Sequence, residues 1–110
     1  MFEKLFEQLN NELDFQIAEF AWTAAPSGVD YGTLSLGGEA EQTWADGHRA
    51  ETASEATLEV ITRSNGINRI QQVEAILNSV EGLSFYREFI EYEDAIQALR
   101  ISWILQWVGV

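Results

Sequence analysis

The sequence of 110 residues contains no cysteine, which excludes disulfide bonds, thiolate chemistry and cysteine-ligated metals. It contains one histidine, His48, so no second imidazole is present to complete a metal-ligand set. Basic residues are also scarce, because 6 lysines and arginines stand against 18 aspartates and glutamates, for a formal net charge of −12. A field of this sign opposes contact with nucleic acids and anionic membranes, since binding them requires cations that displace counterions.

Long apolar runs are missing as well. No run approaches the 18 or so residues that a membrane-spanning helix requires, so we expect a soluble protein without membrane contact. The first ten residues, MFEKLFEQLN, have glutamates where a signal peptide would have its apolar centre. Repeats and low-complexity tracts are absent too. The 46% hydrophobic content and 4 tryptophans are ample for one core, so we predict one domain over residues 1–110.

The segment Ile96–Trp107 is the richest in large apolar side chains. From Leu99 onward every odd position is large and apolar, and the even positions are mixed. This two-residue alternation predicts a β-strand with one face in a core. Because no other segment offers as much apolar surface, we expect this strand to lie centrally in the sheet.

Two helices and several further strands are predicted around it. Apolar residues recur at steps of three and four from Phe2 to about Asn10, and again from Ile67 to about Gly82, as in amphipathic helices. The order of elements indicates an α+β domain, with an antiparallel-rich sheet of about five to six strands and two helices packed on one face. The other strands are expected at 15–22, 31–36, 39–45, 49–62 and 83–92.

Two glycine-containing dipeptides are typical of hairpin turns. Gly37-Gly38 suits a two-residue turn, and Asp46-Gly47 suits a type I′ turn, in which both central residues have positive φ. The segment Glu39–Glu55 is too polar to pack wholly on a small core, so we predict a long projecting hairpin. Trp44 is its one large aromatic residue. Either Trp44 packs back on its own sheet, or it anchors another subunit.

Residues that could carry chemistry are few. Glu91, Glu93 and Asp94 lie close together, and paired carboxylates perform acid–base catalysis when burial separates their pKa values. Their place in a turn between strand ends favours solvated side chains instead. No EF-hand spacing and no glycine-rich phosphate loop occur, and His48 beside a turn is typical of a solvated residue. We therefore predict no catalytic residues, no cofactor and no metal, and a protein that is not an enzyme.

Several short segments of the sequence are similar to those of a known protein family. They are AWTAAP at 21–26 followed by Asp30-Tyr31-Gly32, then Trp44-Ala45-Asp46, and Tyr92-Glu93-Asp94 before a strand rich in aromatics. Together, over nearly the whole chain, they resemble the tail terminator, or tail-completion, proteins of tailed bacteriophages. The resemblance implies a virion protein assembled in the host cytoplasm. It would form a homo-oligomeric ring, commonly of six subunits, joining the tail tube to the neck, with DNA passing through unbound.

We expect two groups of residues at interfaces, one in the hairpin and one at strand ends and the apolar C-terminus. They are Trp44, Asp46, Arg49, Glu91, Glu93, Asp94, Trp107 and Val110. Three other hypotheses are considered. One is a different virion part, such as a head–tail connector or tail-tube protein. Another is an acidic inhibitor that mimics DNA and blocks a nucleic-acid-binding protein, which predicts a monomer or dimer in place of a ring. The third, a small enzyme, is disfavoured because the sequence shows no nucleophile–base set.

Overall fold

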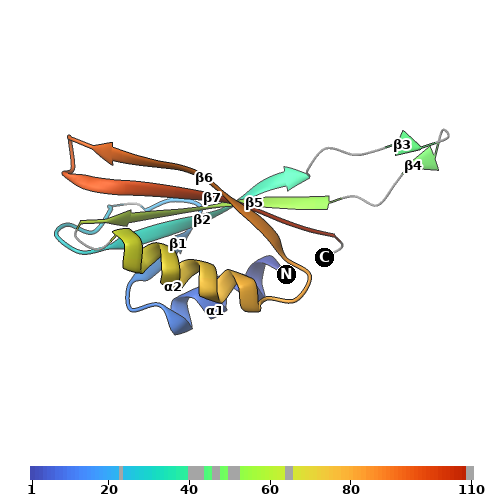
Figure 1. Cartoon of the computed structure of the whole chain (residues 1–110), viewed down its shortest axis with the longest axis horizontal. Helices are drawn as coiled ribbons and strands as arrows, with labels where there is room; N and C mark the ends of the chain where they lie inside the picture. The colour runs from blue at the N-terminus through green and yellow to red at the C-terminus, as the bar shows by residue number, and fades with distance from the viewer. Residues whose placement is uncertain (23, 40–43, 46–47, 50–52, 64–65, 109–110) are drawn as a thin grey trace.

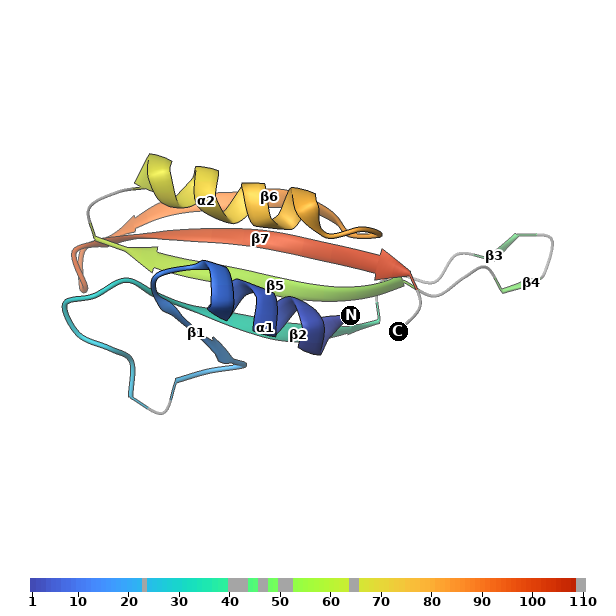
Figure 2. The ribbon, with the colours of Figure 1, turned by 90° about the horizontal axis from the view of Figure 1, so that it is seen from below.

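The computed structural model describes residues 1–22, 24–39, 44–45, 48–49, 53–63 and 66–108. It has two layers, a β-sheet and a pair of helices that lie against the same face of that sheet (Figure 1). The helices are α1, Phe2–Glu12, and α2, Gly66–Ser79. Seen from below in Figure 2, the two helices lie side by side under the sheet. The predicted α+β class, with both helices on one face, is confirmed.

The main sheet has five strands in the order β1-β2-β5-β7-β6. β1 runs parallel to β2, and the remaining neighbours are antiparallel. A separate two-stranded ladder, β3-β4, lies beyond the end of this sheet (Figures 1 and 2). The strand bounds are Gln16–Glu19 for β1, Tyr31–Glu39 for β2, Trp44–Ala45 for β3, His48–Arg49 for β4, Ala53–Thr62 for β5, Ser84–Glu93 for β6 and Ala98–Val108 for β7.

The alternation in β7 places its odd residues in the core, as predicted. Ile101, Trp103 and Leu105 are fully buried and pack with apolar residues of both helices. β7 is paired along both sides, by β5 and β6, but the middle place in the sheet belongs to β5. The helix residues of this core are Leu5 and Leu9 of α1 and Val73, Ile76 and Leu77 of α2.

The prediction of a hairpin turn at Gly37-Gly38 is wrong. β2 continues through both glycines to Glu39, and its antiparallel partner is β5 rather than a segment at 39–45. Leu36 pairs with Ala56 and Glu39 pairs with Ser54, so β2 has one more residue than β5 in this interval. Such a β-bulge is a common position for glycine inside a strand. Gly37 and Gly38 therefore lie at a β-bulge in β2 and not at a turn.

The ends of the first elements also differ from the prediction. α1 continues past Asn10 to Glu12, and β1 is shorter than the predicted 15–22 because Phe20 adopts a positive φ of 69°. Phe15 precedes β1 and is buried in the core, 8% exposed. Neither described helix is long and apolar enough to cross a membrane.

Candidate interaction surfaces

The helices leave one face of the sheet uncovered, and we call it the open face. In β5, Leu58 and Val60 belong to the core beneath the helices, so the alternation places Glu55 and Glu59 on the other side. The pairings of β6 with β7 place Glu91 and Glu93 there, and Glu88, which has no pairing partner, accepts a hydrogen bond from Ser102 on the same face. In the described strands, Arg100 is the one basic residue on this face. The glutamates of the open face are Glu55, Glu59, Glu88, Glu91 and Glu93.

Three of these glutamates are held by neighbours on the same face. Glu93 forms an ion pair with Arg100. Glu88 accepts a hydrogen bond from the Ser102 hydroxyl at 3.3 Å, and Glu55 accepts one from the Gln106 amide at 3.0 Å. Among the described residues, Glu59 and Glu91 form no ion pair, so most of the negative charge of this face is uncompensated.

A shallow hollow of about 330 Å³ lies on the open face beside the Arg100–Glu93 pair. Its charged groups include both members of that pair, so their charges are already satisfied by each other. Within the described part of the chain, no group of three or more histidine, aspartate or glutamate side chains is arranged to hold a metal ion. The remaining lining residues are Tyr31, Gly32, Thr33, Glu59, Ile61 and Ile96.

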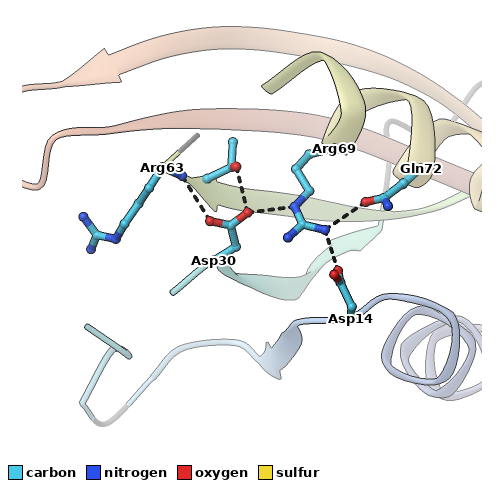
Figure 3. A network of polar contacts seen from close by, with 6 residues as sticks. Asp14, Asp30, Arg63, Arg69 and Gln72 are labelled. Atoms are coloured by element: carbon cyan, nitrogen blue, oxygen red, sulfur yellow. Dashed lines mark hydrogen bonds and ion pairs between the residues drawn. The ribbon is translucent and has the colours of Figure 1, made fainter. Parts of the chain in front are cut away.

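A second polar group lies at the end of the sheet where β2 begins and β5 ends, and it is centred on Arg69 of α2 (Figure 3). The Arg69 Nε donates to Asp30 Oδ2 at 2.7 Å, and Nη1 donates to Asp14 Oδ1 at 2.5 Å. Nη1 also donates to the Gln72 side chain at 2.9 Å, and the guanidinium lies 4.6 Å from the centre of the Phe15 ring. Protein groups thus use three of the five N–H donors of this guanidinium, and two carboxylates balance its charge.

Asp30 is the second centre of the same network. Burial would raise the pKa of its carboxyl, but hydrogen bonds from Arg69, Thr62 and the Arg63 backbone outweigh that effect and lower the pKa below its ordinary value. Asp30 precedes β2, Thr62 ends β5 and Arg69 belongs to α2, so the network ties three elements together at one end of the sheet. Its chemistry is that of a structural brace.

The predicted hairpin arm is seen in the ladder β3-β4, where Trp44 pairs with Arg49 and Ala45 pairs with His48. Asp46 and Gly47, the predicted turn, lie outside the described residues and are flanked by the pair Ala45–His48. The ladder projects beyond the sheet along the longest axis of the molecule, which extends 52 Å (Figure 1).

The other predicted interface residues lie elsewhere. Glu91 and Glu93 are on the open face of β6, and Asp94 is exposed in the turn that follows, at the end of the molecule opposite the ladder (Figure 1). Trp107 is 5% exposed and belongs to the core of this chain, so it is covered without a partner. Val110 lies outside the described residues. The structure thus separates Glu91, Glu93 and Asp94 from the ladder and places Trp107 in the core, so the predicted interface residues do not form one site.

No family model matches the sequence, and no curated protein matches it. The resemblance to phage tail terminator proteins therefore depends on the short segments at 21–26, 30–32, 44–46 and 92–94.

Proposed function

We propose that this chain is a structural virion protein that forms a ring at the end of a bacteriophage tail tube and joins the tube to the neck. The observation that carries the proposal is the open face, an uncovered sheet surface with five glutamates and one arginine. A ring threaded by DNA needs a wall that does not retain it, and carboxylates repel phosphates across such a channel. In this arrangement the open face lines the channel and the helices lie outside.

The arm supplies the second argument for assembly. A two-stranded ladder that projects from a small domain has little of its own chain to pack against, and Trp44 lies within it. Tryptophan is enriched among the residues that dominate binding at protein interfaces. We propose that the arm contacts a neighbouring subunit or the tail tube. Its partners would be copies of this chain, the tail-tube protein and the neck proteins, in the virion, with no cofactor and no catalysis.

A second candidate uses the same acidic face. Carboxylates presented along an uncovered sheet can imitate the phosphates of DNA, and the protein would then inhibit a nucleic-acid-binding protein. This candidate requires no self-assembly and predicts a monomer or dimer at all concentrations. A head–tail connector or tail-tube protein is the nearest alternative within the virion, and it shares the requirement for a ring.

The mass of the purified protein in solution separates these candidates. Light scattering is expected to give a particle of about six chains. Because the chains repel one another at −12 each, assembly should strengthen as salt screens them, the screening length being about 8 Å at physiological ionic strength. A monomer or dimer at every concentration and salt level would overturn the ring, and loss of assembly on adding salt would point to ion pairs between subunits.

A pair of charge variants tests the placement of the open face. Glu59→Lys with Glu91→Lys changes two open-face glutamates, and Glu3→Lys with Glu7→Lys changes two residues of α1 by the same net charge. If the open face lines the channel, the first variant should retain linear double-stranded DNA in a gel-shift assay more strongly than the second. Equal retention of DNA by the two variants would contradict this placement.

A further inference from the structure

The two edges of the main sheet differ in their capacity to accept another strand. At the β1 edge, the side chain of Asn10 occupies the outward backbone groups of Ile17. Its Oδ1 accepts a hydrogen bond from the Ile17 N–H at 2.9 Å, and its Nδ2 donates to the Ile17 carbonyl at 3.1 Å. The amide of Asn10 thus stands where the peptide group of an added strand would be. This edge is also short, since β1 has 4 residues.

The opposite edge is β6, a strand of 10 residues that pairs on its inner side with β7. Among the described residues, no strand pairs with its outer side. β6 also carries three large apolar side chains that are about half exposed, Tyr86 at 54%, Ile90 at 45% and Tyr92 at 59%. A long edge strand with exposed apolar side chains is a template for pairing with another chain.

We propose that two copies of this chain pair through their β6 strands, edge to edge and antiparallel, so that two five-stranded sheets become one. The inference stands independently of the proposed function. Because the β1 edge is occupied, pairing through β6 closes after two copies and does not extend into a fibre.

A β-bulge in β6 determines which residues can face each other in the pair. Arg87 is opposite Trp103 and Phe89 is opposite Ser102, so Glu88 is an extra residue. After the bulge the alternation is shifted by one. Tyr86 therefore shares the open face with Glu91, and Arg87 shares the helix-covered face with Ile90. If each face of the joined sheet is to be continuous, an odd-numbered residue of one copy must therefore lie opposite an even-numbered residue of the other.

One register meets this condition and uses the whole strand. Its two-fold axis passes between Glu88 and Phe89. Residues of one copy then face residues of the other in the pairs Phe85–Tyr92, Tyr86–Glu91 and Arg87–Ile90. Ser84 then faces Glu93 and Glu88 faces Phe89, so no two like charges are directly opposite. If this register is shifted by two residues in one direction, Glu88 lies opposite Glu91 and two like charges meet. If it is shifted in the other direction, Tyr92 and Glu93 extend beyond the end of the partner strand.

Cysteine cross-linking tests the register directly, because the native chain contains no cysteine. The double variant Tyr86→Cys with Glu91→Cys should form disulfide-linked dimers under mild oxidation. Within one chain these positions are five residues apart along an extended strand, too far to bridge. The matched control is Tyr86→Cys with Ile90→Cys, which places the thiols on opposite faces and should give at least tenfold less dimer. Equal cross-linking of the two variants, or none in the first, would overturn the register.

Two variants that introduce opposite charges at one position test the strength of the pairing. Ile90 faces Arg87 of the second copy in the proposed register, so Ile90→Lys should weaken pairing at least tenfold relative to Ile90→Glu, measured by sedimentation at matched salt. Net charge alone predicts the opposite order, since lysine reduces the repulsion between acidic chains and glutamate increases it. If Ile90→Glu pairs no better than Ile90→Lys, the inference fails. Thermal melts of both variants verify that each is folded.

The outcomes for the pair and for the ring are separable. A particle of about six chains in which the 86–91 cross-link never forms would leave the ring standing and refute the β6 pair. A dimer with that cross-link and no larger particle would establish the pair and refute the ring. A monomer at every concentration would refute both.

Discussion

The indole Nε1 of Trp103 donates a hydrogen bond of 2.8 Å to the Glu74 carboxylate, which also accepts one of 2.9 Å from Arg87. Glu74 belongs to α2, Trp103 to β7 and Arg87 to β6, so one carboxylate joins the helix to two neighbouring strands. Burial would raise the pKa of Glu74, but the hydrogen bonds from Trp103 and Arg87 outweigh it and lower the pKa below its ordinary value. The largest fully buried side chain of the core is thus fixed in orientation by a charge-assisted bond.

Replacement of Trp103 should be the most damaging core change in β7. Trp103→Ala is expected to lower the free energy of unfolding by about 3–5 kcal/mol, as for other buried aromatic residues. Gln106→Ala, on the open face of the same strand, should cost under about 1 kcal/mol. Urea denaturation of both variants measures the difference, and equal losses would contradict the assignment of faces.

Asp30 should give the fold a dependence on acid pH. Its carboxyl has a lowered pKa in the folded protein, so its stabilising contribution is complete above the ordinary aspartate pKa of about 3.9. As pH falls through the folded pKa, that contribution is lost. Asp30→Asn should therefore cost about 1.5–3 kcal/mol near neutral pH, the range of hydrogen bonds to charged groups. In denaturant melts across a pH series, the gap from the native chain should close toward pH 2.

Asp14→Asn is the matched control for that experiment. Asp14 bonds the same guanidinium, but its side chain is 71% exposed, compared with 10% for Asp30. An exposed ion pair contributes about 1 kcal/mol or less because solvent screens it. If the two variants lose equal stability, the buried part of the network is not what stabilises this end of the sheet.

Trp44 tests the role of the arm. Trp44→Ala should leave the melting temperature of the monomer nearly unchanged while weakening self-association or tail binding by about 2 kcal/mol or more. Trp107→Ala provides the contrast, since Trp107 is buried in the core and its loss should lower the melting temperature. A melting temperature that falls by several degrees for Trp44→Ala, with association untouched, would place Trp44 in the core of its own chain.

The periodicity of apolar residues within a segment predicts the helices and the most apolar strand. The alternation from Leu99 to Trp107 and the apolar spacing of the two helices correspond to β7, α1 and α2. The predicted turn at Gly37-Gly38 is wrong because a glycine pair suits both a tight turn and a bulge. Long-range pairing decides between the two, and it appears when Leu36 and Glu39 are matched against β5.

The polar contacts that organise the surfaces were beyond local patterns. Arg69 and Asp30 are 39 positions apart, and nothing near either residue indicates the other. The scarcity of basic residues is a usable signal, because an arginine in an amphipathic helix of so acidic a chain has many carboxylates available as partners. Asn10 reads as a helix-ending residue, and its contact with Ile17 depends on how the chain turns back from α1 into β1.

The position of β7 has a consequence for how the chain folds. β7 follows β5 and β6 in the sequence, yet it lies between them in the sheet, and its pairing joins Val108 to Ala53 and Leu99 to Thr62. During synthesis β5 and β6 are therefore made before the strand that joins them, and each has an unpaired edge until residues 98–108 have left the ribosome. Contacts so distant in sequence slow folding, because the loop must close before they form. The sheet is thus completed only after residues 98–108 have been made, and until then the unpaired edges of β5 and β6 can pair with other chains.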